Sequence, residues 1–285
     1  MNEKQKGLLI DIFVYIGAFT AGVIPFLLIG NIFLAVAAFT AAATLFVFIF
    51  STILKDVSVY DPYWSVAPPV MLILVMLKYR LWNVNAFILL ALFLLWAARL
   101  TLNWYYTYPG LGREDWRYAQ YREKCSPFVF HLISFVGLHF VPTIVVYLGF
   151  TSTLFSVQES RFAVLSLLGA AVMAGAVFLE YTADTAIHRF LAEHKGEHLT
   201  CNISVWKYSR HPNYLGEMLF WTGGFLYFAA LRPDIWYLGL GFLSIIALFL
   251  TVSIPMMEKH NRERRVDYEE YKAKTSMLLL LPNRK

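Results

Sequence analysis

The chain has 285 residues, of which 59% are hydrophobic and 15% are charged. Soluble domains are roughly half apolar and about a quarter charged, so these totals exclude an ordinary soluble protein and predict an all-α, multi-pass membrane bundle. The net charge of +5 does not indicate nucleic-acid binding, because the basic residues lie mostly in loops between apolar blocks, where they set membrane topology. The two cysteines, Cys125 and Cys201, have no CxxC spacing and predict no metal site.

Eight apolar segments are each expected to form a transmembrane helix, since a bilayer core takes roughly 20 helical residues. The first follows Lys4 and Lys6 like a signal peptide, but its apolar run exceeds the usual length of about 7–15 residues, so we expect a retained helix. The third is the shortest, and the double proline Pro68-Pro69 makes its start the least defined boundary. The predicted helices cover residues 8–30, 31–53, 66–80, 84–104, 129–150, 162–188, 214–230 and 234–255.

The basic residues predict which side of the membrane each loop occupies. With eight crossings and a cytoplasmic N-terminus, all but four of the 24 lysines and arginines lie on the cytoplasmic side. This agrees with the excess of lysine and arginine in the cytoplasmic loops of membrane proteins. Both termini are then cytoplasmic. Two polar loops (about 105–128 and 189–213) and the tail (256–285) share that side, so we expect any soluble cofactor to bind there.

The stretch "WKYSRHPNYLGEMLFW", residues 206–221, places many hydrogen-bonding groups at the start of the seventh segment. A residue before proline avoids helical angles, so we expect His211 outside the helix and Asn213 as a cap. A helix N-terminus and Arg210 both favour phosphate, which predicts a pocket for an anionic ligand. Anchoring in the headgroup layer is the alternative for the aromatic and basic members, but it does not explain Asn213 or Glu217.

Glu180, Asp184 and His188 recur every four positions at the end of the sixth segment and so share one helical face. Ionisable groups at membrane depth usually face the bundle interior, which favours a functional role; a solvated helix end is the alternative. In the tail, His260 and Arg264 either complete a polar site or belong to a basic amphipathic segment that lies on anionic lipid.

Asp56 and Asp61 are the two carboxylates between the second and third segments. An acid at a membrane interface can serve as a proton donor, whereas Asp61-Pro62 is equally typical of the start of a turn. Both interpretations remain open.

The motif "YSRHPNYLGE", preceded by "ADT" and followed by "YEEYKAKTSMLLLLP" in the tail, resembles the steroid 5-alpha-reductase-like membrane family. Within this family, the chain is most similar to the bacterial branch called domain of unknown function 1295. The stretches "DVSVYDPYWS" and "RLTLNWYY" also resemble that branch. The resemblance divides the chain into N-terminal helices (1–54) and a reductase-like domain (55–285). The fold that it implies is a seven-helix reductase-like core plus an extra N-terminal helix. It implies a multi-pass protein of a bacterial inner membrane.

The family uses NADPH to reduce a carbon–carbon double bond in a lipid, so the resemblance implies NADPH as cofactor and a sterol-, isoprenoid- or enone-like lipid as substrate, besides contacts with membrane lipids. The proton donor is expected to be Asp61, with Asp56 or Tyr105 as substitutes. The residues expected to bind the cofactor are Glu180, Asp184, Arg189, Lys207, Tyr208, Arg210, His211, Asn213, Tyr214, Glu217, His260 and Arg264.

Some family features are missing from the chain. The steroid reductases carry an asparagine at the position of Glu180 and a tyrosine near that of Arg264. They also use a Gln-Glu pair to bind the substrate carbonyl, and this chain has no such pair. Their tyrosine acid is replaced here by Trp96. Two alternatives therefore stay open. One is an S-adenosylmethionine-dependent methyltransferase of the isoprenylcysteine type, which shares a shorter RHPxYxG motif; the other is a non-catalytic lipid-binding scaffold.

Overall fold

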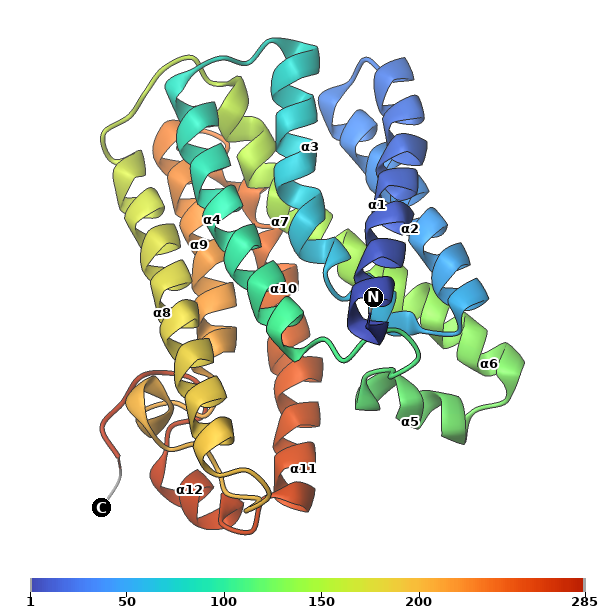
Figure 1. Ribbon diagram of the computed structural model, residues 1–285. Coiled ribbons are helices and arrows are strands. Elements are labelled where there is room, and N and C mark those ends of the chain that lie inside the picture. Colours follow the sequence, from blue (N-terminus) through green and yellow to red (C-terminus); the bar gives the residue numbers. More distant parts are fainter. Residues whose placement is uncertain (1, 284–285) are drawn as a thin grey trace. The chain divides into compact units, whose positions relative to one another are not determined.

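The computed structural model describes residues 2–283, which form helices joined by short loops, with no strand in that range (Figure 1). The chain divides into two compact units, Met1–Ser160 and Arg161–Lys285. All eight segments predicted from the sequence fall on helices. Seven helical stretches in the described range are long and apolar enough to cross a membrane, so the chain is a multi-pass membrane protein. These stretches are Glu3–Leu28, Ile32–Leu54, Val57–Tyr79, Val84–Thr107, Pro127–Gln158, Ser166–Glu193 and Trp236–Arg264.

In the first unit, α1 (Glu3–Leu28) and α2 (Ile32–Leu54) form a helical hairpin. The turn is closed by Asn31, whose side-chain oxygen accepts from the backbone N–H of Phe33 and of Leu34, both at 3.0 Å. The remaining elements are η1 (Val57–Tyr60), α3 (Tyr63–Tyr79), α4 (Val84–Thr107), α5 (Trp116–Lys124), α6 (Pro127–Leu132), the π-helix η2 (Ile133–Phe140) and α7 (Val141–Gln158).

The core of the first unit is made by small and aromatic side chains. Ala18 of α1 and Ala43 of α2 are fully buried beside Tyr63 of α3, and small residues of this kind allow membrane helices to approach closely. On the outer surface of the same helices large apolar side chains stay exposed, for example Phe13 at 70% and Leu28 at 82%. This arrangement suits helices whose outer faces contact lipid.

Helix α3 begins at residue 63 instead of the predicted 66, so Pro68 and Pro69 lie inside it. A proline has no N–H for the carbonyl four residues earlier, and the helix therefore lacks the backbone hydrogen bonds to Trp64 and Ser65.

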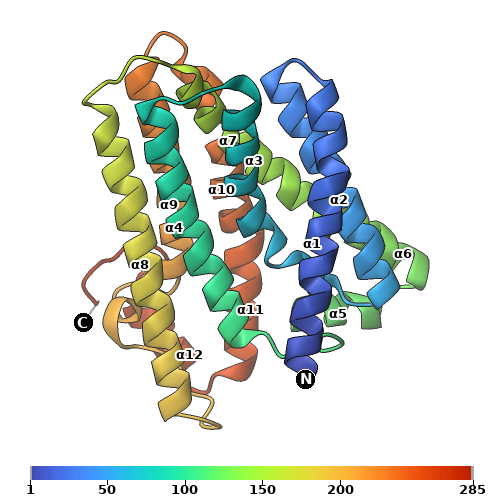
Figure 2. The same cartoon turned by 45° about the horizontal axis from the view of Figure 1, so that its top comes forward.

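In the second unit, α8 (Ser166–Glu193) and α9 (Pro212–Leu231) lie side by side, as both Figure 1 and Figure 2 show. A methyl group at Gly223 would come within 2.8 Å of the Gly169 carbonyl oxygen, so the two backbones pack at glycines. The other elements are η3 (Ser204–Lys207), η4 (Trp236–Gly239), α10 (Phe242–Leu248), the π-helix η5 (Phe249–Ser253), α11 (Ile254–Arg264) and α12 (Tyr268–Lys274).

Helix α9 coincides with the seventh predicted segment but is not one of the seven stretches that qualify as membrane spans. Its sequence contains polar residues such as Asn213 and Glu217 and three glycines, which lower its mean hydropathy. Twelve of its residues are buried, so α9 is an interior helix of the second unit.

Candidate functional site

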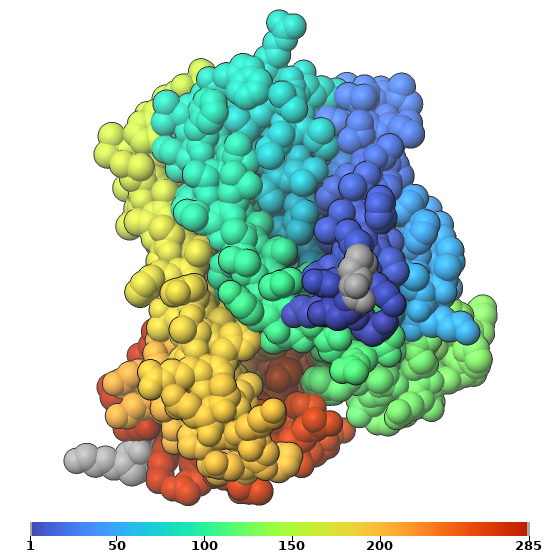
Figure 3. All heavy atoms as spheres, in the orientation of Figure 1, coloured from blue at the N-terminus to red at the C-terminus, as the bar shows by residue number. Residues whose placement is uncertain are grey.

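The loop after α8 and the C-terminal tail are bound to each other in the second unit. We call these two segments, residues 198–211 and 265–281, the tail clasp. The backbone N–H of Arg210 donates to the Ser276 carbonyl at 2.9 Å. In the space-filling view the yellow-orange loop and the red tail lie together at one end of the unit (Figure 3). Two polar segments far apart in the sequence are thus joined in one structure.

Glu258 of α11 makes charged contacts with both segments of the tail clasp. Its Oε1 accepts from Arg210 Nε at 2.8 Å and lies 3.0 Å from His211 Nε2, and its Oε2 lies 3.4 Å from Lys272 Nζ. Arg210 Nη1 also donates to the Thr275 carbonyl at 2.7 Å. The Arg210 side chain is only 9% exposed, so this ion pair is largely shielded from solvent.

Two tyrosines of α12 pack beneath these charges. The Tyr271 hydroxyl donates to the Trp206 carbonyl at 2.6 Å, and the Tyr268 hydroxyl is buried beside Glu258. Burial, and for Tyr268 also the neighbouring Glu258 carboxylate, raises the pKa of both phenols above its ordinary value. Both therefore remain neutral hydrogen-bond donors at physiological pH.

Three carboxylates of the second unit are buried on α8 and α9: Glu180 is 0%, Glu217 4% and Asp184 8% exposed. The side chain of Glu180 lies directly against Gly216 of α9. Carboxylates are almost never fully buried unless they are paired or functional, so this helix pair holds a polar interior. The predicted interior positions of Glu180 and Asp184 agree with this burial.

The start of α9 differs from the prediction in one respect. His211 lies just outside the helix and occupies the cap position, as expected for a residue before proline, whereas Asn213 is the second helical residue and is not the cap. Pro212 at the first helical position explains this, because its fixed φ angle and missing N–H suit that place. The rings of His211 and Tyr214 stack with centroids 5.4 Å apart.

The other predicted cofactor residues lie nearer the surface. Arg189 is exposed and its guanidinium pairs with Glu193 at 2.8 Å. Lys207, Tyr208 and Arg264 are exposed, and His260 is half-buried on α11. The structure thus brings Arg210 and His211 to one acceptor, Glu258. Lys207 lies within the tail clasp, and Arg264 directly precedes its second segment.

Asp56, in the first unit, has a structural role. Its Oδ1 accepts from the Ser58 N–H at 2.9 Å and its Oδ2 from the Gly112 N–H at 2.8 Å. Because both carboxylate oxygens bind backbone N–H groups, Asp56 joins η1 to the loop before α5.

Asp61 has a different environment, since its Oδ1 accepts from the Tyr118 hydroxyl at 2.5 Å. Tyr118 is buried, and burial together with the Asp61 carboxylate raises the pKa of its phenol. The Tyr118 proton is therefore held in this hydrogen bond. Tyr105, by contrast, is exposed at the end of α4, where Lys4 Nζ lies 4.4 Å from its ring centroid.

NADPH, the cofactor that the resemblance implies, carries phosphates, ribose hydroxyls and a carboxamide. The buried carboxylates of α8 and α9 can accept hydrogen bonds from hydroxyl and amide groups, and the exposed Lys207 and Arg264 suit phosphates. Arg210 already binds Glu258 and two tail carbonyls, so it acts by positioning the tail. With Arg210 in that role, the side chains of the second unit still include acceptors and cations of the kinds that a dinucleotide needs.

Sequence reasoning missed two of the main contacts. The role of Glu258 as common acceptor depends on partners 47 and 48 positions away, and Tyr118 is 57 positions from Asp61. The available signal was compositional, namely a carboxylate directly after the last apolar segment and a tyrosine in a charged loop.

Helical membrane spans and polar residues collected in the second unit define the chain as a multi-pass membrane protein with a polar site. The chain belongs to the family described as "Protein of unknown function (DUF1295)", which matches residues 47–275; this prediction from the sequence is confirmed. The chain is similar to the uncharacterized protein C594.04c of Schizosaccharomyces pombe, with 25% identity over 268 residues that cover 81% of this chain and 76% of that one. No solved structure matches the chain.

Proposed function

We propose that the chain is an NADPH-dependent membrane oxidoreductase of the steroid 5-alpha-reductase-like type, which reduces a carbon–carbon double bond in a sterol-, isoprenoid- or enone-like lipid. The observation that supports this most is the burial of Glu180, Asp184 and Glu217 on α8 and α9. Three buried carboxylates are costly in a membrane protein and are usually retained for function.

When bound, NADPH supplies the hydride. The buried carboxylates of α8 and α9 would accept hydrogen bonds from its ribose hydroxyls or carboxamide, and Lys207 and Arg264 would bind its phosphates. Arg210 and Glu258 hold the tail clasp over the start of α9. In this proposal the clasp positions the cofactor-binding residues and does not itself contact the reacting atoms.

Reduction of a double bond also requires a proton, and the contacts favour Asp61 as its source among the three candidates. Asp61 shares a 2.5 Å hydrogen bond with the Tyr118 hydroxyl, whereas both oxygens of Asp56 bind backbone N–H groups and Tyr105 is exposed. A carboxyl group that has taken up a proton can act as a general acid.

The proposal includes eight crossings, with α9 as one of them, both termini and the cofactor site in the cytoplasm, and a bacterial inner membrane as the location. The distribution of lysine and arginine supports it, because only Lys78, Arg80, Arg161 and Arg232 fall on the opposite side. A green fluorescent protein fused to the C-terminus should fluoresce, and a periplasmic phosphatase reporter there should be inactive. An active phosphatase would contradict this topology.

Titration of the purified full chain with NADPH tests the function. We expect saturable binding that Glu217→Gln weakens about tenfold, as the loss of a hydrogen bond to a charged group implies, while Glu123→Gln, an exposed change on α5 of the first unit, has no effect. Absence of binding at millimolar NADPH would exclude the reductase. Binding of S-adenosylmethionine alone would favour the methyltransferase, and binding of neither would favour the lipid-binding scaffold.

A further inference from the structure

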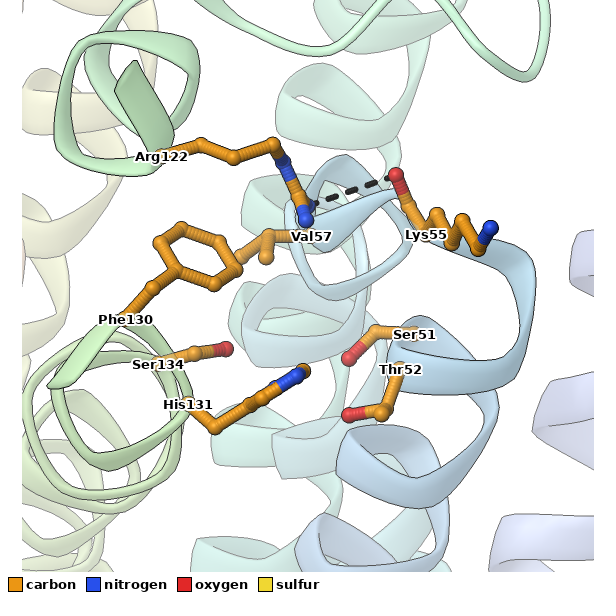
Figure 4. A pocket seen from close by; sticks show the side chains of 8 residues that line it. All are labelled: Ser51, Thr52, Lys55, Val57, Arg122, Phe130, His131 and Ser134. Carbon is orange, nitrogen blue, oxygen red and sulfur yellow. Dashed lines mark hydrogen bonds between the residues drawn. The ribbon is translucent and has the colours of Figure 1, made fainter. Parts of the chain in front are cut away.

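A cavity of about 170 Å³ lies within the first unit, where the end of α2 meets η1, α5, α6 and η2 (Figure 4). This volume exceeds the roughly 30 Å³ that a water molecule occupies in the liquid, so a small polar group fits inside. Eight residues line the cavity: Ser51, Thr52, Lys55, Val57, Arg122, Phe130, His131 and Ser134. None of them has a role in the proposed reductase.

The floor of the cavity is polar and held in position. Figure 4 shows the His131 imidazole and the hydroxyls of Ser51 and Ser134 directed into it. Behind them, buried His139 has Nδ1 2.7 Å from the Ser134 carbonyl oxygen and Nε2 3.1 Å from Ser51 Oγ. His139 is part of the π-helix η2, and π-helical turns occur frequently at functional sites.

Arg122 forms one wall of the cavity and is ion-paired with Glu114, which lies outside the lining. Its guanidinium is fixed by two hydrogen bonds to Glu114, at 2.7 and 2.9 Å, and by one to the Lys55 carbonyl at 3.3 Å. It also lies 4.1 Å from the centroid of the Phe130 ring. A guanidinium held in one orientation needs little reorganisation to bind a ligand oxygen.

The lining contains two permanent cations, Arg122 and Lys55, and no carboxylate. Lys55 ends α2 in a left-handed conformation, with φ of 55°, and its exposed ammonium lies at the rim, directed outward in Figure 4. With imidazole and hydroxyl groups beside these cations, the lining suits an anionic group rich in hydrogen-bond acceptors, such as a phosphate.

The surface next to the cavity is apolar. Phe128 and Leu132 of α6 are 78% and 53% exposed, and Ile53 at the end of α2 is 64% exposed. One membrane span ends at Leu54 and another begins at Pro127, so the cavity lies where spans end, at the depth of the lipid headgroups. Its ligand therefore has both a polar group and an apolar part.

We propose that this cavity binds the phosphate of an anionic membrane lipid, whose acyl chains lie along Phe128 and Leu132 of α6. Arg122, His131 and the Ser134 hydroxyl contact the phosphate, and Lys55 lies at the rim. The site is independent of the proposed reductase activity, because it uses no residue of the NADPH site and no proton donor.

The test is a lipid titration of the purified full chain in detergent, followed by thermal unfolding and native mass spectrometry. The probes are phosphatidylglycerol, the uncharged diacylglycerol and inorganic phosphate. We expect phosphatidylglycerol to bind best, and the double variant Lys55→Gln/His131→Gln to bind it at least about fivefold more weakly, as the loss of a charge contact implies. Both side chains are exposed, so the unliganded variant should unfold at the wild-type temperature.

Lys124→Gln is the matched control, since it removes one exposed charge from α5 outside the lining; its affinity should stay within about twofold of wild type. Equal binding of diacylglycerol, an equal loss in Lys124→Gln, or inorganic phosphate binding as well as the lipid would each overturn the proposal.

Discussion

Gly216 of α9 lies so close to Glu180 of α8 that a methyl group at position 216 would overlap Glu180 Cγ and come within 3.1 Å of its Oε1. The carboxylate is therefore buried between two helices only because residue 216 has no side chain. Gly216 thus allows the close spacing of α8 and α9 together with Gly169 and Gly223, and it sets the place of a candidate cofactor residue.

Gly216→Ala should destabilise the chain by about 1–3 kcal/mol, the usual cost of overpacking a core, and should weaken NADPH binding because Glu180 must move. Thermal unfolding in detergent and the NADPH titration measure the two effects. Gly175→Ala on α8 is the control, since a methyl group there meets open space and alanine is favoured in a helix by up to about 1 kcal/mol. Equal unfolding temperatures for the two variants would show that the helices tolerate a wider spacing.

Glu258→Ala should release the tail clasp. It leaves the shielded Arg210 guanidinium without its carboxylate, and removal of one partner of a buried ion pair costs on the order of 3 kcal/mol. Hydrogen exchange of residues 268–281 should accelerate more than exchange of α1, which belongs to the other unit.

The control for Glu258 is Glu269→Gln. Glu269 pairs with Arg262 at 2.6 Å, but these side chains are 66% and 55% exposed, so the cost should be below about 1 kcal/mol. If both variants exchange at the wild-type rate, Glu258 does not hold the tail in place.

The helices could be predicted from the sequence because hydropathy is a local property. Each apolar block from residues 8–30 to 234–255 falls on a helix. The boundaries were less accurate where polar residues continue a helix, as in α8, which extends to Glu193 instead of ending at 188. Phe190, which is buried within this extension in a cluster with Cys201 and Trp206, keeps that polar end helical.

The site was less predictable because its contacts join residues far apart in the chain. The buried face of Glu180 and Asp184 follows from a four-residue period, which the sequence displays. The pairing of Arg210 with Glu258 follows from the return of the tail to the loop after α8. No regular spacing in the sequence predicts this contact. Its consequence, that Arg210 positions the tail, could come only from the structure.

The two cysteines should differ in reactivity. Cys201 is 7% exposed, and burial raises the pKa of its thiol to about 11, although Arg265 partly opposes this shift; Cys125 is half-buried at the end of α5. Because the thiolate is the nucleophile, maleimide at neutral pH should modify Cys125 and leave Cys201 intact until the chain unfolds. Mass spectrometry of Cys125→Ser and Cys201→Ser identifies the modified residue.

The same shift predicts a change of stability with pH. The folded state holds the Cys201 proton more tightly than the unfolded chain, whose thiol has a pKa of about 8.5. The stabilisation is therefore complete below that value and is lost as the pH rises toward about 11. Cys201→Ser should be less sensitive to alkaline pH than wild type, and an identical dependence would contradict the shift.

Asparagine substitutions at Asp56 and Asp61 should separate stability from catalysis. In Asp56→Asn the side-chain NH2 group faces the backbone N–H of either Ser58 or Gly112, depending on the orientation of the amide. One hydrogen bond is lost in both orientations, so the variant should cost about 1–3 kcal/mol and unfold at a lower temperature. Asp61→Asn can still accept from Tyr118, so it should unfold near the wild-type temperature. Because an amide cannot donate the carboxyl proton, its NADPH consumption with a lipid extract should fall by at least about 100-fold.

Tyr118→Phe completes this comparison, since it keeps the Asp61 carboxyl and removes only the hydroxyl that binds it at 2.5 Å. Its pH–rate profile should shift, because the phenol no longer stabilises the Asp61 carboxylate, whereas a purely structural role would lower activity equally at every pH. Full turnover by Asp61→Asn would remove Asp61 as the proton donor. Loss of turnover by Asp56→Asn at an unchanged unfolding temperature would assign that role to Asp56.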